Sequence, residues 1–322
     1  NQTFEFDDIV RGNLSFQSED IEDWIIMKDN GIPTYNFAVV IDDHYMEITH
    51  VLRGEEHITN TPKQVMLYEA FNWEVPLFGH MTIIVNENKK KLSKRDKGVM
   101  QFLSEYAELG YLPEAIVNFL AVLGWNPGTE QEMFTINELI QSFSFERCSK
   151  SGAKFDFEKG KWFNHKYIQD TPNDKIAELV KPYIESQGVT FDKEFTSRVA
   201  GLVKERVYLL SDFWDQSSFF FKAPDSYDQK VVKKRWKEDT PNQMRELIGV
   251  IDKLEGFSSQ EQEIAIKQWI KENEYNMGGV MNAFRLSIVG ESKGPHMFDI
   301  TELIGKKETT ARIQRAISKI DE

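Results

Sequence analysis

The feature that most constrains the fold is a change of hydrophobic period near residue 99 of the 322-residue chain. Before it, short apolar runs alternate with turn residues, and the opening stretch NQTFEFDDIVRGNLSF predicts strands. After it, apolar residues recur at helical spacing. Residues 113–124, for example, begin with proline, end with glycine and carry an apolar stripe. The chain is therefore expected to be mixed and mostly α, with two or three domains.

The helical period predicts further helices over 174–187, 194–211, 240–254 and 259–273. Helix starts are expected at Thr61 and Thr240, where proline follows the threonine and glutamine stands three places on. Ser258 with Glu261 has the spacing of a capping box. The run from Phe37 to Ile41 predicts instead a strand buried on both faces, and residues 81–90 predict another short strand.

The composition of the chain limits the partners, metal sites and compartments that can be expected. The chain has no run of about 18 apolar residues and no charged-then-apolar leader, so no membrane partner and no secretion are expected. Cys148 is the only cysteine in the sequence, which excludes an internal disulfide and a zinc site built on several thiolates. The six histidines lack the spacing of a metal site, so no metal site is expected. A reducing cytoplasm is the expected compartment.

One basic loop stands out in a chain of net charge -13: NKKKLSKRDKG, residues 88–98. Composition alone favours a solvated lysine-rich loop. The alternative is a phosphate-binding loop, because the segment follows a predicted strand, Leu92 can anchor it and Gly98 can let it close. Ammonium groups placed there would stabilise the charge that develops on a reacting phosphate.

The stretch Lys91-Leu92-Ser93-Lys94-Arg95 resembles the second signature of class I aminoacyl-tRNA synthetases, Lys-Met-Ser-Lys-Ser. Its surroundings, NGIPTYNFAVVIDDHYMEITHVLRGEEHITNTPKQVMLYEAF over 30–71, are similar to bacterial-type glutamyl-tRNA synthetases. The stretch FERCSKSGAKFDFEKGKWFNHKYI over 145–168 is similar to the same family, so the resemblance covers essentially the whole chain. It implies the C-terminal half of a Rossmann-like α/β nucleotide-binding fold, followed by all-helical stem-contact and anticodon-binding domains.

The resemblance also implies domain boundaries. Residues 1–34 correspond to the end of an inserted acceptor-binding domain and 35–90 to the second half of the catalytic domain. Residues 91–171 correspond to the signature loop with the stem-contact domain, and 172–322 to the anticodon-binding region. The family's other signature, His-Ile-Gly-His, does not occur in this sequence. The expectation is therefore a fragment that is inactive on its own, cut from a monomeric parent enzyme.

Several site residues follow from the resemblance. Tyr35 and Arg53 match glutamate-binding residues, and a guanidinium fork suits a carboxylate. The alternative for Arg53 is a structural ion pair with Asp42 or Asp43. Glu56 matches an ATP-binding residue, with an acidic helix start as its alternative. The resemblance assigns catalysis to three residues of the basic loop and ATP contact to five: catalytic Lys91, Ser93 and Lys94; ATP-binding Lys91, Leu92, Ser93, Lys94 and Arg95.

Two basic and aromatic stretches are candidates for tRNA contact, because basic groups meet phosphates and rings stack on bases. KVVKKRWK, residues 230–237, and KWFNHKYI, residues 161–168, supply Lys233, Lys234, Arg235, Trp236, Lys161 and Lys166. The alternative is a basic helix face with buried aromatic rings, and it is favoured for Trp162 and Phe163.

The implied reaction is that of a glutamate–tRNA ligase. Glutamate and ATP, with Mg²⁺, give glutamyl-adenylate, and the glutamyl group passes to the 3′ end of tRNA(Glu). Two alternatives remain: a tRNA-binding module that does not catalyse, and a truncated paralogue that glutamylates a modified base. The paralogue ranks last, because it normally lacks the helical anticodon region. The sequence leaves open whether tRNA(Gln) is also charged.

Overall fold

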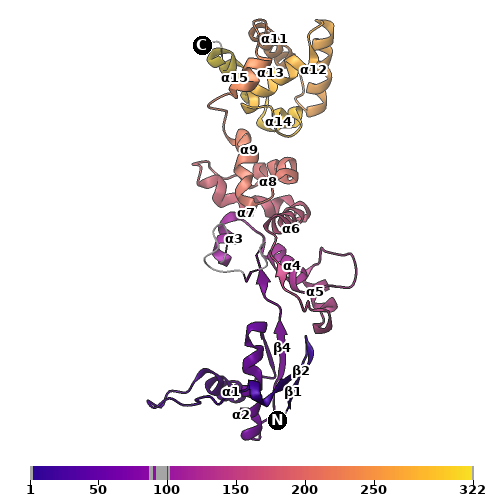
Figure 1. Ribbon diagram of the computed structural model, residues 1–322. Helices are drawn as coiled ribbons and strands as arrows, with labels where there is room; N and C mark the ends of the chain where they lie inside the picture. The colour runs from indigo at the N-terminus through magenta and orange to yellow at the C-terminus, as the bar shows by residue number, and fades with distance from the viewer. Residues whose placement is uncertain (1–2, 87–89, 92–99, 101, 321–322) are drawn as a thin grey trace. The chain divides into compact units, whose positions relative to one another are not determined.

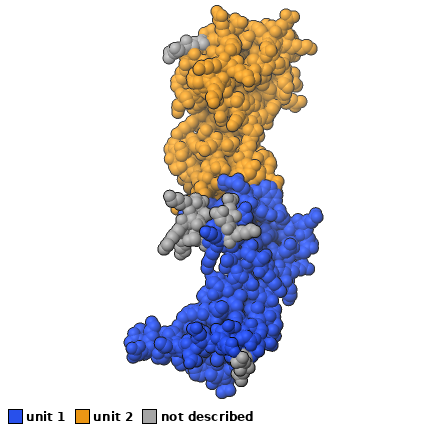
Figure 2. Space-filling model, in the orientation of Figure 1, with its two compact units in different colours: residues 1–105, 112–163 blue, residues 106–111, 164–322 orange. Residues whose placement is uncertain are grey.

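The structure, a computed structural model, describes residues 3–86, 90–91, 100 and 102–320. The chain divides into two compact units (Figure 2): unit 1 comprises residues 1–105 and 112–163, and unit 2 comprises residues 106–111 and 164–322. No helix in the described ranges is long and apolar enough to cross a membrane.

Unit 1 is built on a four-stranded sheet with the order β2-β1-β4-β3 (Figure 1): β1 (Thr3–Asp8), β2 (Gly12–Gln17), β3 (His50–Gly54) and β4 (Leu77–Met81). The predicted strands of the opening stretch are confirmed: β1 and β2 form an antiparallel hairpin. β4 runs parallel to both of its neighbours, pairing Asp8 with Phe78 on one side and Arg53 with His80 on the other. This register brings three polar residues to neighbouring positions on adjacent strands.

Two helices pack together beside this sheet, α1 (Tyr35–Tyr45) and α2 (Thr61–Ala70), and share a core of Val40, Leu67 and Tyr68. The short helix η2 (Glu55–Asn60) leads from β3 into α2, and the predicted start at Thr61 is confirmed. The predicted strand from Phe37 to Ile41 is wrong, because these residues lie in α1. Of that run only Val40 is fully buried, as expected for a helix with one apolar face, and a short apolar run does not distinguish the two structures by period.

A second, two-stranded parallel sheet in unit 1 joins β5 (Ile84–Val85) to β6 (Ala153–Lys154). The predicted strand over 81–90 is thus divided between the end of β4 and β5. The helices of this part are α4 (Pro113–Gly124), with the predicted bounds, and α5 (Ile136–Ser142). The helices α3 (Leu103–Leu109) and α6 (Phe157–Asp170) continue across the division between the units.

The described residues of unit 2 form helices joined by loops, without a strand. Its helices are α7 (Asn173–Glu185), α8 (Lys193–Val203), α9 (Phe213–Phe221), α10 (Gln229–Arg235), α11 (Thr240–Lys253), α12 (Ser259–Glu272), α13 (Met277–Val289), α14 (Met297–Ile304) and α15 (Lys306–Ile320). Buried residues at helical spacing, such as Met244, Leu247 and Ile251 in α11, explain why the period predicts them.

Two predictions in unit 2 have different outcomes. The capping box at α12 is confirmed, since the Glu261 N–H donates to Ser258 Oγ at 3.3 Å and the Ser258 N–H donates to Glu261 Oε2 at 3.0 Å. The helix predicted over 194–211 is shorter, because α8 ends at Val203 and two short 3₁₀ turns follow. Between them Val207 is extended and fully buried, so packing interrupts the helix there. The mixed, mostly α fold class is confirmed.

Candidate active site in unit 1

Arg53, at the carboxyl end of β3, is held by neutral side chains. Its Nε donates to His80 Nε2 at 3.1 Å. Its Nη2 donates to Thr61 Oγ1 at 2.8 Å and to Gln64 Oε1 at 2.9 Å. Burial lowers the pKa of the guanidinium, while the Tyr35 phenol and the Asp43 carboxylate oppose the shift. The arginine is thus a partly buried cation whose direct partners in the interior are uncharged.

The alternative role, a structural ion pair with Asp42 or Asp43, does not describe this geometry. Among the described residues, no carboxylate oxygen lies within 4.0 Å of a nitrogen of Arg53. Asp43 acts on Arg53 only from a distance: burial raises the pKa of Asp43, and the arginine lowers it again in part.

A buried pair, Asp8 and His80, lies behind Arg53. Both side chains are fully inaccessible, and His80 Nδ1 lies 2.6 Å from Asp8 Oδ2. Burial alone would raise the pKa of Asp8, but hydrogen bonds from the His80 ring and from the N–H groups of Arg11, Val10 and His80 hold it below its ordinary value. Burial lowers the pKa of His80, and the neighbouring carboxylate does not reverse this. The pair is therefore a carboxylate next to a neutral imidazole.

Tyr35 and Arg53, the two predicted glutamate-binding residues, are brought together. Tyr35 is the first residue of α1, its side chain is exposed, and its phenol lies close enough to Arg53 to act against the lowering of the guanidinium pKa. Its ring centroid is 6.1 Å from that of His57, whose carbonyl oxygen lies 3.5 Å from Arg53 Nη2. The amino end of α1 and the carboxyl end of β3 thus place an aromatic wall next to a cation.

Two predicted ATP-binding residues also meet. Lys91 Nζ lies 2.6 Å from Glu56 Oε1, and both side chains are solvent-exposed. The hydrogen bond from Lys91 lowers the pKa of Glu56. The other predicted residues of the signature loop, Leu92, Ser93, Lys94 and Arg95, lie outside the described residues.

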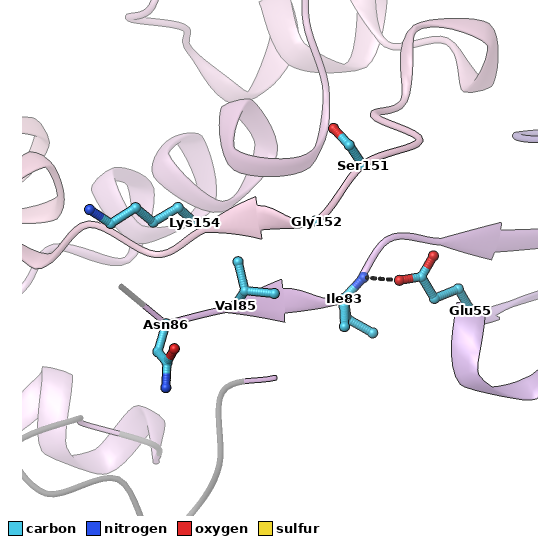
Figure 3. Close-up of a pocket in the computed structure, with 7 residues that line it drawn as sticks. All are labelled: Glu55, Ile83, Val85, Asn86, Ser151, Gly152 and Lys154. Atoms are coloured by element: carbon cyan, nitrogen blue, oxygen red, sulfur yellow. Dashed lines mark hydrogen bonds between the residues drawn. The ribbon is translucent and has the colours of Figure 1, made fainter. Parts of the chain in front are cut away.

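Beside β5 and β6 the structure has an open cavity of about 620 Å³ (Figure 3), lined by Glu55, Ile83, Val85, Asn86, Ser151, Gly152 and Lys154. Glu55 accepts a hydrogen bond from the Ile83 N–H at 3.4 Å and pairs with Arg11. Sequence reasoning missed these lining residues, although Ser151 and Gly152 fall within the family-like stretch 145–168. The cavity lies beside the strand that leads into the signature loop.

Reasoning from sequence also missed the groups that hold Arg53. Asp8 and His80 are 72 positions apart, and no motif joins them. Thr61 is recognised as a helix start, but its buried hydroxyl makes no cap and instead contacts Arg53 and His80.

The candidate tRNA-binding residues differ in exposure. Lys233 and Lys234 are exposed on α10, Arg235 is half-buried, and Trp236 packs against the cluster of Tyr227, Leu286 and Ala316. Lys161 pairs with Glu158 at 3.2 Å in unit 1, and Lys166 donates to Gln169 at 3.2 Å in unit 2. Phe163 is fully buried, as the alternative interpretation expects, whereas Trp162 keeps 37% of its surface exposed.

Comparison with known proteins shows the family. Residues 1–162 match the family described as tRNA synthetases class I (E and Q), catalytic domain, and residues 175–317 match an anticodon binding domain. The chain therefore belongs to the class I tRNA synthetases (E and Q), and the predicted fold, half of a Rossmann-like domain followed by helical domains, is confirmed.

Individual relatives are similar over nearly the whole chain. The glutamate–tRNA ligase of Porphyromonas gingivalis is 47% identical over 98% of this chain, and that of Flavobacterium johnsoniae is 45% identical over 99%. A crystal structure of a glutamate tRNA ligase from Elizabethkingia meningosepticum, in complex with its amino acid, matches 99% of the chain with a TM-score of 0.92 and 38% identity. In each case the chain spans 66% of the relative's length.

Proposed function

We propose that this chain is part of a glutamate–tRNA ligase, which activates glutamate with ATP and transfers it to the 3′ end of tRNA(Glu). The observation that carries the proposal is the meeting of Tyr35 with Arg53, an exposed phenol next to a cation whose interior partners are neutral. Relatives named as glutamate–tRNA ligases that align over 98% of the chain support it.

In the first step, an α-carboxylate oxygen of glutamate attacks the α-phosphorus of ATP. A new oxygen–phosphorus bond forms, the bond to the bridging oxygen breaks, and pyrophosphate leaves. In the second step, a hydroxyl of the terminal adenosine of tRNA attacks the activated carbonyl carbon, and AMP leaves. The protein positions these groups and stabilises their charges, without a covalent enzyme intermediate.

Within this reaction, Arg53 binds the side-chain carboxylate of glutamate and Tyr35 forms a wall of its pocket. Glu56 contacts ATP, and Lys91 and Lys94 hold its phosphates, with Ser93, Leu92 and Arg95 completing the loop. In this structure Glu56 holds the Lys91 ammonium, so ATP phosphates would compete with that carboxylate for the lysine.

Mg²⁺ is proposed to enter with ATP. No group of three or more His, Cys, Asp or Glu in the described part of the chain is arranged to hold a metal ion. Mg²⁺ typically keeps several waters and binds substrate phosphates together with one or two carboxylates.

The helical unit is proposed to bind tRNA, because an anticodon binding domain matches residues 175–317 and Lys233 and Lys234 are exposed for phosphate contact. We infer a monomeric protein that works in the cytoplasm, where ATP and tRNA are supplied. A tRNA-binding module without catalysis is the second candidate, favoured by the same anticodon-domain match.

Pyrophosphate exchange with glutamate, ATP and tRNA(Glu) tests the proposal. It should be measured in this chain and in the chain joined to the remaining third of the length of its relatives. Exchange in the longer protein supports the ligase. Exchange in neither, together with tight tRNA binding, would favour the binding module and remove the catalytic roles of Arg53 and Lys94.

A further inference from the structure

Asp8, His80 and Arg53 form a buried polar chain across three adjacent strands. The strand order β1-β4-β3 places His80 between the other two, and the register pairs it directly with Arg53. His80 Nδ1 is 2.6 Å from Asp8 Oδ2, and His80 Nε2 is 3.1 Å from Arg53 Nε. Neither Asp8 nor His80 can reach solvent, so their contribution to the site passes through Arg53.

The hydrogen bonds determine which ring nitrogen of His80 carries the proton. Arg53 Nε always donates, so His80 Nε2 must accept. A neutral imidazole that accepts at Nε2 has its proton at Nδ1, where Asp8 accepts it. Asp8 also accepts from the N–H groups of Val10 and Arg11, both at 2.9 Å, which orient the carboxylate.

The same network determines which part of Arg53 remains for a ligand. Nε is bonded to His80, and the two hydrogens of Nη2 point to Thr61 and Gln64. Gln64 in turn donates from its amide nitrogen to Asn36 Oδ1 at 3.0 Å, which orients its oxygen towards the arginine. These interior hydrogen bonds occupy Nε and Nη2 of Arg53. The remaining nitrogen, Nη1, is the one that can face Tyr35 and a substrate.

We propose that Asp8 and His80 are positioning residues for glutamate recognition: Asp8 holds His80 as the Nδ1–H tautomer, and His80 with Thr61 and Gln64 orients Arg53 so that Nη1 meets the side-chain carboxylate of glutamate. This inference rests on the proposed function. It adds a reason for specificity. Neutral acceptors fix the guanidinium without neutralising it, so its charge favours a carboxylate over the uncharged amide of glutamine.

Asp8→Asn tests the tautomer step. An asparagine can still accept from Val10 and Arg11, but it presents an N–H group to His80 Nδ1. The ring then moves its proton to Nε2, which faces the Arg53 Nε donor, and the two donors repel. The analogous exchange in the serine protease triad acts through the same wrong tautomer. Asp7→Asn is the matched control, since Asp7 is the exposed neighbour on β1 and accepts a hydrogen bond from Asn13 Nδ2 at 3.0 Å.

The first measurement is the ¹⁵N NMR signature of the His80 ring in this chain, assigned by its loss in His80→Gln. We expect the Nδ1–H tautomer in the unchanged chain and in Asp7→Asn, and the Nε2–H tautomer in Asp8→Asn. An Nε2–H or doubly protonated ring in the unchanged chain would overturn the inference. This result does not depend on substrate, so it stands even if the ligase proposal fails.

The second measurement is glutamate-dependent pyrophosphate exchange in the longer protein. Asp8→Asn should raise the KM for glutamate about tenfold to a hundredfold, by analogy with the outer-shell partners of metal ligands, and leave the KM for ATP unchanged. The preference for glutamate over glutamine should fall by a similar factor. An equal loss for glutamate and ATP, with a lower unfolding temperature, would show a merely structural pair and overturn the inference.

A second pair of variants protects the test against misfolding. His80→Gln can donate to Asp8 and accept from Arg53, whereas His80→Leu can do neither. We expect His80→Gln to retain most of the glutamate preference and His80→Leu to lose it. Equal kinetics in the two variants would overturn the role of the hydrogen bonds.

Discussion

Arg312 in unit 2 is fully buried and Arg53 in unit 1 is partly buried, and the two arginines are held differently. Arg312 on α15 is 2% exposed and donates to the Glu308 carboxylate at 2.8 Å and to the carbonyl oxygens of Phe219 and Ile288 at 2.5 and 3.0 Å. Arg53 has only neutral acceptors inside and an exposed tyrosine beside it.

This difference distinguishes Arg312, a cation with a structural role, from Arg53, a cation that is available to bind a ligand. Burial lowers the pKa of both arginines, but Arg312 is opposed by a directly bonded carboxylate and Arg53 by a phenol. The charge of Arg312 is compensated and enclosed, so it contributes to stability. The charge of Arg53 is held in place without an ion pair, so it can bind an anionic ligand.

The largest effect is expected at Arg53. Arg53→Lys keeps the charge but removes the planar set of donors that His80, Thr61 and Gln64 hold. Glutamate-dependent pyrophosphate exchange in the longer protein should fall by about a hundredfold or more, as when one preorganised donor is lost. Arg312→Lys is the control and should change exchange little in the fraction that folds.

The reverse should hold for stability. Arg312→Met leaves two buried carbonyl oxygens without a donor, and each unsatisfied group costs about 1–3 kcal/mol. The free energy of unfolding, measured by urea denaturation, should fall by about 2–5 kcal/mol. If Arg53→Met destabilised the chain as much, the contrast between the two arginines would be lost.

As the pH is lowered, unit 1 should lose stability before unit 2 does. The pKa of His80 is lowered in the fold, so below about 6.5, the ordinary histidine value, the unfolded chain binds more protons and stability falls as pH falls. The lowered pKa of Asp8 adds a further loss at lower pH, as the carboxylate protonates.

Amide hydrogen exchange, compared at pH 7.5 and 5.5, measures this difference. Protection of β4 should decrease at the lower pH after correction for intrinsic rates, whereas α15 should change less. His80→Gln should remove most of the change in β4. Equal losses in β4 and α15 would show that His80 is not the group responsible.

The smallest effect is expected at the capping box of unit 2. Ser258→Ala removes the acceptor of the Glu261 N–H, and loss of such a cap costs about 1 kcal/mol. Thermal unfolding should show a lower midpoint, with pyrophosphate exchange unchanged. Ser318→Ala is the control, because Ser318 lies on the exposed side of α15. The neighbouring Ser259 is unsuitable as a control, because its hydroxyl contacts Asp299 at 2.6 Å.

Much of unit 2 could be predicted from sequence, since its helices depend on local information. Buried residues recur at helical spacing, as Ile176, Val180 and Ile184 do in α7, and serine or proline marks several starts. The exception is the segment after Val203, where burial of Val207 interrupts the helix.

In unit 1 the family motifs predicted Tyr35, Arg53, Glu56 and Lys91 as site residues, and the structure brings these residues together in two pairs. The strand predicted from the apolar run Phe37 to Ile41 was wrong, because a short apolar run does not distinguish a strand from a helix by its period; these residues form part of α1, which packs against α2.

The sequence by itself determined most helical segments of unit 2, the capping box at Ser258 and the family motifs, because each depends on residues within a few positions of one another. The tertiary structure decided what surrounds Arg53. Asp8 and His80 are 72 residues apart and meet only through the parallel pairing of β1 with β4. Burial then makes one of them a carboxylate and the other a neutral acceptor, and burial is a property of the packed fold.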